Sequence, residues 1–591
     1  MIISSVPNIS KIMQKYLIPI LLLLSTTFTH AQFAGDHNHP ELTWNVLETE
    51  HFKIYYHQGL APFAKRTAKI AEEAYLPVTQ LYHFEPDEKV RILLKDTDDY
   101  TNGAAYYYHN TIEIWVTNLD FDLRGTTDWV KNVVTHEFTH IVSLQTGRKG
   151  SRKVPALFFH YLRYQGEGKR DDILDSYPNV LALYAIPMTM IPPWFAEGTA
   201  QYMARGVQFD RWDSHRDMIL RQATLNNTLL TYQEMNVFGS KTGLGFEKVY
   251  DHGYSLVLFI ANTFGQDKLE DLCRSMATWW RYDFDGATKS ILGISSRELY
   301  NRWVSSLEER YKAQKIRIDF NPASGSLLHQ KGYLNLHPRW SPDGTQLAFL
   351  TNQGQDFGRT SLVSFTLSDS SLKRISPSAN TAFDWSPDGN HILYTRRSQP
   401  NRYGSRFWDL YTVPPDASGE GPFQQMKDAI GLSRSTFPGE TRLTHDLRAI
   451  HPAYSPDGTR IAFVKNGGGN TNLGILDVNT GEIHYRTDFK DGTQVYTPRW
   501  SPDGSQIAFS IFQPGNSRDI ATISTESGPW TLQAASSGTD RDPCWTPDGN
   551  GLVFVSDNEG IFDLYHLTLA DGTVHRITRV PGSAFQPHIN P

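Results

Sequence analysis

Cysteine is almost absent from this sequence, with only Cys273 and Cys544 among 591 residues. Two cysteines this far apart exclude a disulfide framework, and no C-x-x-C pair is present to suggest a redox or cysteine-rich metal motif. We therefore predict that both are small buried apolar residues, with a bridge between two domains as the alternative.

Long apolar runs are also missing from the mature chain. The apolar residues 16–24 cover about half of the ~20 residues that a membrane-spanning helix needs. Lys11 and Lys15 precede this run and a polar stretch ending at Ala31 follows it, which is the pattern of a secretory signal peptide. We expect residues 1–31 to be removed, and a periplasmic or extracellular protein without a transmembrane segment; an N-terminal membrane anchor is the alternative.

No block of basic residues occurs, and the net charge is only −7. This charge pattern argues against nucleic acid as a partner. The length argues for at least two domains, because single hydrophobic cores stop growing at roughly 250–300 residues.

The C-terminal half repeats one phrase five times. The copies read HPRWSPDGTQLAFL, FDWSPDGNHILYT, HPAYSPDGTRIAFV, TPRWSPDGSQIAFS and DPCWTPDGNGLVFV. The Ser or Thr before each Pro-Asp-Gly stands at 341, 386, 455, 501 and 546, so the intervals are 45, 69, 46 and 45 residues. A sixth, truncated copy occupies residues 585–591, and the long interval indicates an inserted loop within residues 401–441.

This repeat predicts a β-propeller. Each copy has a strand, a tight turn suited to Pro, Asp and Gly, and a second strand that alternates apolar and polar residues. A period of ~45 residues is that of one four-stranded blade. The phrase resembles that of the TolB-like propellers over residues 326–591. We predict six blades, the sixth being shared between the two ends of this half.

Residues 32–312 have no such period and predict a separate α+β domain whose second part is helical. The patterns indicate strands at 44–56, 89–95 and 111–116, helices at 61–82 and 128–145, and a helical region at 214–312. A linker is expected at 313–325, where Asn-Pro-Ala-Ser-Gly breaks the pattern.

The segment His136-Glu137-Phe138-Thr139-His140 carries the clearest chemical signal. Residues four apart share one face of a helix, so both imidazoles can reach one metal ion with Glu137 beside them. Catalytic zinc usually has three protein ligands and one open position, so a third ligand is required. The best candidate is Glu197 in PWFAEGTAQY, where small residues allow tight helix packing; Glu167 and Asp171 are other acids in reach.

With these motifs, residues 42–312 resemble the gluzincin metallopeptidases of the peptidase-MA-like group, which have HExxH on one helix and W-F-x-E-G on a second. The resemblance implies a zincin-like fold and one Zn²⁺ per chain, with His136, His140 and Glu197 as ligands. It also implies that Glu137 is the general base that accepts the proton of a zinc-activated water.

Two further features are implied by the same resemblance. Gluzincin aminopeptidases have a Tyr in Y-x-x-G that stabilises the oxyanion, and Tyr250-Asp251-His252-Gly253 has this form. His252 or Tyr254 could donate instead, or Tyr250 could simply pack. Residues 111–116 would be the edge strand that pairs with substrate.

One departure concerns the kind of peptidase. Gluzincin aminopeptidases carry G-x-M-E-N before the active helix, whereas the counterpart here is GAAYY at residues 103–107, without the acid that binds a free amine. We therefore expect an endopeptidase acting on peptides or proteins, with the propeller gating substrate or docking a protein partner. The alternative is an envelope binding or assembly protein whose zinc site is structural or inactive.

Overall fold

The computed structural model describes most of the chain from residue 39 to residue 590. The described ranges leave out residues 119, 121–122, 152, 154–156, 164–178, 187–188, 203–209, 239–242, 333, 355–359, 377–378, 380 and 418–438. The predicted signal peptide and two candidate ligands, Glu167 and Asp171, lie outside the described residues. Within these ranges, no helix combines the length and apolar character needed to cross a membrane.

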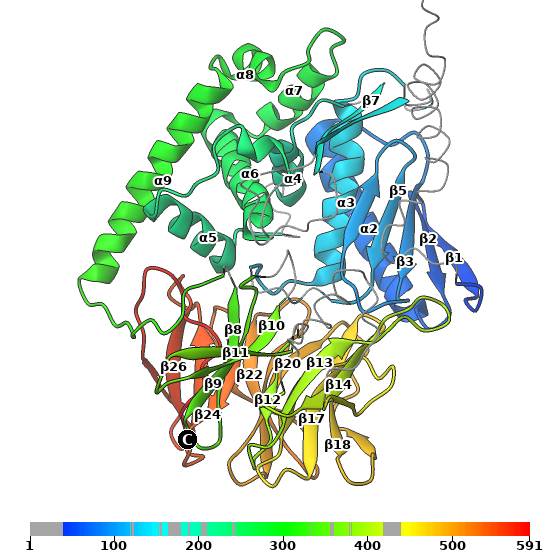
Figure 1. The fold of residues 1–591 in the computed structure, drawn as a ribbon. Coiled ribbons are helices and arrows are strands. Elements are labelled where there is room, and N and C mark those ends of the chain that lie inside the picture. The colour runs from blue at the N-terminus through cyan, green and yellow to red at the C-terminus, as the bar shows by residue number, and fades with distance from the viewer. Residues whose placement is uncertain are drawn as a thin grey trace, which may run out of the picture.

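The N-terminal region begins with a five-stranded sheet covered by two helices (Figure 1). The strands are β1 Trp44–Glu48, β2 Phe52–His57, β3 Val90–Lys95, β4 Gly103–Tyr106 and β5 Thr111–Trp115, in the order β1-β2-β3-β5-β4. β2, β3 and β5 run parallel, whereas β1 and β4 pair antiparallel with their neighbours. The helices are α2 Ala61–Tyr82 and α3 Trp129–Thr146.

Alternating side chains explain how the sheet and the helices form one core. In β3, Val90, Ile92 and Leu94 are fully buried while the residues between them are partly exposed. Phe138 of α3 packs edge-on against Phe52 of β2 at 5.2 Å between ring centroids. The predicted helices at 61–82 and 128–145 are therefore confirmed, and the predicted strand at 44–56 is a β1–β2 hairpin.

The predicted substrate edge is wrong in one respect. β5, at residues 111–115, is bonded on both sides, to β3 and to β4, so its backbone groups are already paired. The edge strand on this side of the sheet is β4, and β1 forms the other edge. The sequence could not indicate this, because β4 has four residues and no alternating pattern, and it pairs with a strand that follows it.

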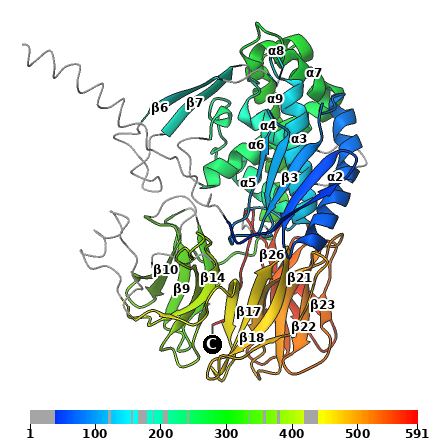
Figure 2. The same cartoon turned by 90° about the vertical axis from the view of Figure 1, so that its right-hand side faces the viewer.

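A helical region follows, and it covers the other side of α3 (Figure 1). Its helices are α4 Pro193–Gln201, α5 Ser214–Leu225, α6 Gly243–Phe264, α7 Asp267–Met276, α8 Phe284–Leu292 and α9 Ser296–Asp319, with a short 3₁₀ helix at Glu234–Asn236. α9 extends beyond residue 312, so the first part of the predicted linker at 313–325 is helical. A hairpin of β6 Leu157–Arg163 and β7 Asn179–Ile186 was not predicted; it projects from this domain in Figure 2.

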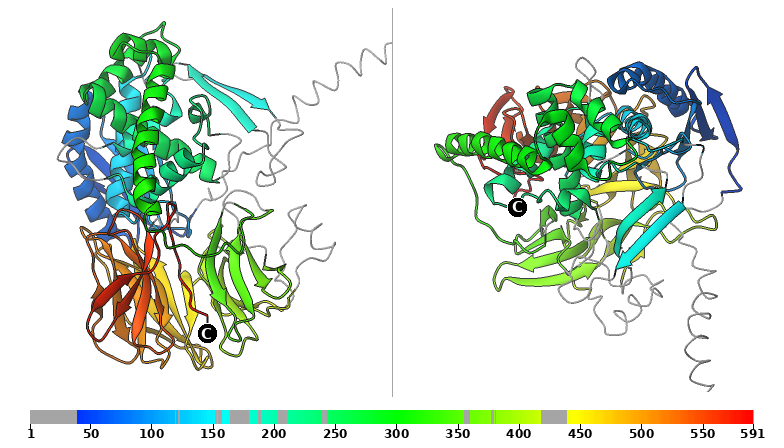
Figure 3. Two further views of the ribbon diagram at one scale, coloured as in Figure 1. Left: turned by 90° about the vertical axis from the view of Figure 1, so that its left-hand side faces the viewer. Right: turned by 90° about the horizontal axis from the view of Figure 1, so that it is seen from above.

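The C-terminal region is an all-β propeller of five four-stranded sheets, which lies against one end of the N-terminal domain (Figures 1 and 3). The blades are β8 Asn335–Trp340, β9 Gln346–Thr351, β10 Ser361–Thr366 and β11 Ser371–Ser376; β12 Asp384–Trp385, β13 Ile392–Arg397, β14 Trp408–Val413 and β15 Thr441–Arg442; β16 Ala449–Tyr454, β17 Arg460–Gly467, β18 Asn470–Asp477 and β19 Ile483–Tyr485; β20 Gln494–Trp500, β21 Gln506–Phe512, β22 Arg518–Ser524 and β23 Thr531–Ala534; β24 Asp540–Trp545, β25 Gly551–Ser556, β26 Asp563–Thr568 and β27 Thr573–Arg576.

The repeated phrase forms the turn between the first two strands of each blade. In the fourth blade, the Ser501 hydroxyl donates to Asp503 Oδ1 at 2.6 Å and Gly504 N donates to the Ser501 carbonyl at 2.9 Å. Gly504 has φ +71°, a conformation that glycine adopts without a steric penalty. Gln506 N also donates to the Ser501 hydroxyl oxygen at 2.9 Å. The predicted turn is therefore confirmed, and the bonds made by the hydroxyl explain why Ser or Thr precedes each Pro-Asp-Gly.

The prediction of six blades is wrong for the described residues. The truncated copy forms an extended segment in which Gln586 has φ +53°. In four blades the residue at the same position of the phrase, directly before a proline, has a similar φ: His337 +54°, His451 +52°, Thr497 +45° and Asp542 +55°. This segment joins the first and fifth blades, because Gln586 Oε1 accepts a hydrogen bond from His337 N and Ala584 N donates to the Phe562 carbonyl.

The described residues contain no further strands that would complete a sixth blade. On the N-terminal side of the propeller, α9 continues to Asp319, and the described residues between α9 and β8 make one isolated bridge, from Ala323 to Arg579, and no strand. The sixth copy therefore fills the space between two blades with one segment and does not build a blade.

The two cysteines are free and buried, Cys273 in α7 and Cys544 in β24. The prediction of two small buried residues is confirmed, and the alternative of a bridge between domains is not.

Candidate metal centre

α3 presents both histidines of the HExxH motif toward α4. The helix begins after Asp128, whose carboxylate accepts a hydrogen bond from Lys131 N, so its first turn is capped. The other sides of α3 are anchored in the core by Val134, Phe138, Ile141 and Val142, all of which are 0% exposed. This burial leaves only one face of the helix, which carries His136 and His140, free to bind a ligand.

α4 brings Glu197 to this face. The helix starts at Pro193, whose missing N–H costs nothing in a first turn. Its small residues were expected to pack against α3, but Gly198 instead contacts α6: a Cβ on Gly198 would lie 2.5 Å from the carbonyl carbon of Gly253. The close contact between α4 and α6 therefore determines where Glu197 stands.

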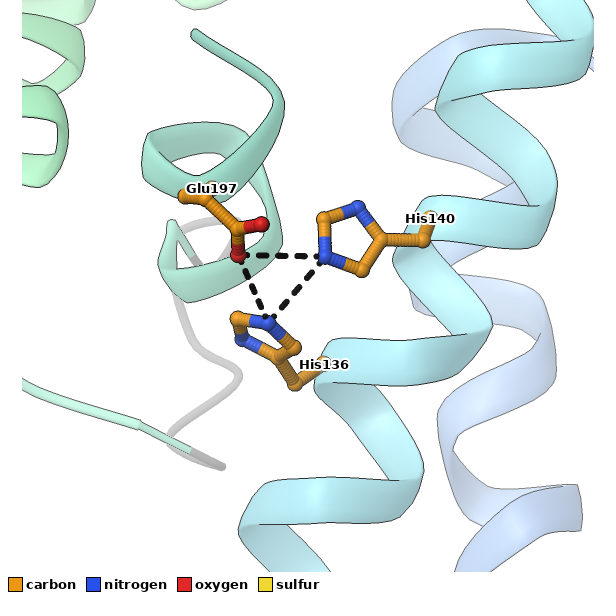
Figure 4. Close-up of side chains that lie close together, drawn as sticks. All are labelled: His136, His140 and Glu197. Carbon is orange, nitrogen blue, oxygen red and sulfur yellow. Dashed lines mark hydrogen bonds and ion pairs between the residues drawn. The ribbon is translucent and has the colours of Figure 1, made fainter. Parts of the chain in front are cut away.

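The three side chains converge on one point, as Figure 4 shows. His136 Nε2 lies 3.1 Å from His140 Nε2 and 3.2 Å from Glu197 Oε2, and His140 Nε2 lies 3.3 Å from the same oxygen. Neighbouring ligand atoms in a tetrahedral zinc site with bonds of 2.0–2.1 Å are about 3.3 Å apart. Two imidazole nitrogens and one carboxylate oxygen at these separations fit a three-coordinate protein site for such an ion.

The electrostatics of the cluster also favour a cation. Burial alone would raise the pKa of Glu197, but His140 and His136 hold the pKa of this carboxyl far below its usual range. Burial would lower the pKa of His140, but Glu197 and Glu137 raise it. The carboxylate therefore stays ionised and draws positive charge to the imidazoles.

Glu137 lies beside the cluster in a cavity of about 660 Å³. His136, Gly103, Tyr250 and Arg124 also line this cavity. Burial raises the pKa of Glu137, which brings it closer to the range of a general base that works near neutral pH. Gly103 of the edge strand β4 packs directly on this carboxyl, because a Cβ at Gly103 would lie 2.5 Å from Glu137 Oε1.

Of the three candidates for the oxyanion donor, Tyr250 is the one that lines this cavity. His252 instead accepts a hydrogen bond from Leu230 N and packs against Trp303. Tyr254 packs against Trp212. Burial raises the pKa of Tyr250 well above its ordinary value, so its phenol is protonated and able to donate.

An ion pair in the cavity wall was not predicted. Arg124 Nε lies 2.5 Å from Glu247 Oε1, and the Arg124 guanidinium lies over the Tyr250 ring at 4.6 Å. Glu247 stands three residues before Tyr250 on α6, so helical spacing could have placed these two on one face. No local pattern could have indicated Arg124, which comes from the loop before α3.

Comparison with known proteins supports the propeller. Residues 440–591 match the family described as TolB beta propeller domain. The chain is 27% identical over 196 residues to "Protein TolB homolog" of Chlorobium luteolum, which is 33% of this chain and 36% of that protein.

Two proteins named as peptidases are also similar. The chain is 36% identical over 150 residues to "Uncharacterized peptidase YuxL" of Bacillus subtilis, covering 25% of this chain and 17% of that protein. It is 25% identical over 278 residues to "Dipeptidyl-peptidase 5" of Porphyromonas gingivalis, covering 41% and 40%. The chain thus spans less than half the length of each of these three relatives.

Among solved structures, TolB from Acinetobacter baumannii is similar with 20% identity and a TM-score of 0.34, covering 43% of this chain and 56% of that chain. The family match, the identities and the five blades together establish a multidomain chain with an N-terminal α/β region and a C-terminal TolB-like propeller.

Proposed function

We propose that this protein is a zinc-dependent peptidase with a zincin-like N-terminal domain, which cleaves within polypeptide chains. The observation that carries the proposal is the convergence of His136, His140 and Glu197 at separations of 3.1–3.3 Å. His136 and the neighbouring Glu137 line a cavity that the edge strand β4 reaches through Gly103. The similarity to two proteins named as peptidases is consistent with it.

His136, His140 and Glu197 would hold one Zn²⁺ per chain. Zinc supplies Lewis-acid polarisation of the scissile carbonyl and a lowered pKa for water. Glu137 accepts the proton of the attacking water and delivers it to the leaving amine, a transfer that its raised pKa assists. The Tyr250 phenol donates a hydrogen bond to the carbonyl oxygen as negative charge develops on it.

β4 would bind the substrate backbone, because an edge strand has one side without a partner strand, to which an extended peptide can be added. Peptide addition at β4 leads the substrate past Gly103, directly over the Glu137 carboxyl. A side chain at position 103 would fill this space.

Cleavage within chains is favoured over removal of N-terminal residues. A free substrate amine needs an unpaired acid in the cavity. Among the residues that line the described cavity, the acids are Glu137, assigned to proton transfer, and Glu247, which is neutralised by Arg124. The counterpart of the amine-binding motif at residues 103–107 contains no acid.

The alternative, a structural zinc site in a binding or assembly protein, requires a fourth protein ligand. In the described part of the chain, the metal-binding cluster consists of His136, His140 and Glu197 and includes no fourth His, Cys or acid. An open coordination position favours catalysis. Export of the protein, and a propeller that gates substrate or docks a protein partner, belong to the same proposal.

The test compares wild type with Glu137→Gln and with Glu308→Gln, a control at an exposed glutamate on α9. Each protein is assayed for zinc content and for cleavage of an unfolded protein. We expect one zinc in all three, cleavage by wild type and control, and none by Glu137→Gln; the cut sites report internal cleavage. Zinc binding without cleavage of any substrate in a broad panel would contradict the proposal and favour a binding protein.

A further inference from the structure

The loop between β3 and β4, residues 96–102, belongs to the catalytic cavity at one end and to the propeller at the other. Tyr100, Thr101 and Asn102 line the cavity that contains His136 and Glu137. The first part of the loop contacts the propeller through three carboxylates, those of Asp96, Asp98 and Asp99.

The carboxylate of Asp99 accepts the most hydrogen bonds of the three, and the residue is 4% exposed. Its Oδ1 accepts hydrogen bonds from Arg448 Nε at 2.7 Å and from Asn466 Nδ2 at 2.8 Å, and its Oδ2 accepts one from Trp408 N at 2.9 Å. These partners belong to the second and third blades, so one carboxylate of the catalytic domain joins two blades.

Arg448 holds a second carboxylate of the same loop. Arg448 Nη2 donates to Asp96 Oδ1 at 2.7 Å, so the guanidinium bridges Asp96 and Asp99. Arg448 has φ +62°, a backbone conformation that is unfavourable for a residue with a Cβ. The surrounding contacts therefore hold the backbone in the conformation that directs this side chain at the loop.

Asp99, which the propeller holds in place, is close to the cavity along the chain. Only Tyr100, Thr101 and Asn102 separate Asp99 from Gly103, which begins the edge strand and packs on Glu137. The Asn102 carbonyl accepts a hydrogen bond from Trp115 N at 3.0 Å, which ties this segment to β5. A displacement of Asp99 would thus move the cavity wall and the start of β4.

We propose that the propeller positions the substrate-binding wall of the catalytic cavity through the contact of Arg448 with Asp96 and Asp99. Arg448, Asp96 and Asp99 are positioning residues in this scheme, since they act through the loop and β4. The inference rests on the proposed peptidase function, but the contact itself can be tested without activity.

The test uses the full chain with Arg448→Met and the matched control Arg460→Met. Arg460 lies at the opposite end of β17 from Asn466 and faces the exposed Glu526. We expect Arg448→Met to keep its zinc, to exchange the backbone amides of residues 100–106 at least about tenfold faster, and to lower kcat/KM about tenfold or more, with KM raised. The control should match wild type.

The rise in KM separates positioning from loss of folded protein, because partial unfolding lowers kcat and zinc content together and leaves KM unchanged. Asn466→Ala removes one bond to Asp99 and leaves the ion pairs, so it serves if Arg448→Met fails to fold; we expect changes of the same sign but smaller. Exchange and KM equal to the control in a cleaving enzyme would overturn the inference and leave the peptidase proposal intact. If wild type cleaves nothing, the proposed function fails, and the exchange measurement still decides whether the contact holds the loop.

Discussion

The contact between α4 and α6 provides a sharp test of how the proposed metal site is built, through the substitution Gly198→Ala. The new Cβ would lie 2.5 Å from the Gly253 carbonyl carbon, whereas ordinary contacts begin at 3.4 Å, so the helices must separate by about 1 Å. Glu197 is the adjacent residue, and metal–ligand distances tolerate changes of only about 0.2 Å.

We therefore expect the zinc dissociation constant of Gly198→Ala to rise about 100-fold or more, since even changes beyond the ligands cost about 10–100-fold. Overpacking should also lower the free energy of unfolding by about 1–3 kcal/mol. Competition with a chromophoric chelator measures the first effect, and thermal unfolding measures the second.

The control is Gly325→Ala, where a Cβ would meet nothing within 4 Å. It should bind zinc as wild type does. If Gly198→Ala binds zinc within about threefold of wild type, the close helix contact does not determine the position of Glu197.

Substitutions of two buried residues, Tyr250 and His252, give further predictions. Tyr250→Phe should lower kcat about 100-fold or more and leave zinc content and KM little changed, because it removes one hydrogen-bond donor to the carbonyl oxygen on which negative charge develops. An unchanged kcat in steady-state kinetics would exclude Tyr250 as this donor. His252 has its pKa lowered to about 3 by burial, so below about pH 6.5 the unfolded chain takes up a proton that the folded chain does not. The free energy of unfolding should therefore fall as the pH falls. Between about pH 7 and 5, urea unfolding should show that wild type loses about 2 kcal/mol more of this free energy than His252→Gln does. Equal losses would show that His252 is not buried in its neutral form.

Local patterns predicted the elements that depend on neighbours in the chain. The 3.6-residue period located α2 and α3, and the spacing of four residues placed His136 and His140 on one helix face. The propeller turns were predictable for the same reason, since each is made by the Ser or Thr, Asp and Gly of one short phrase.

Features that depend on pairing between distant segments were not predictable in this way. The edge strand is β4 and not β5, because β5 is bonded to β3 as well as to β4. The blade count depends on whether a terminal segment finds partner strands, and the truncated copy instead lies between two complete blades. Neither pairing leaves a signal in the residues concerned.

The repeat, the turn chemistry and the identity of the candidate ligands could all be read from the chain, since they reside in short segments whose geometry is set by helix and turn periodicity. Tertiary packing was needed to establish that Glu197 meets the two histidines, that Arg124 pairs with Glu247, and that Arg448 of the propeller pairs with the loop leading to the cavity beside Glu137. These contacts join residues 57 to 352 positions apart, and they depend on the packing of whole helices and blades.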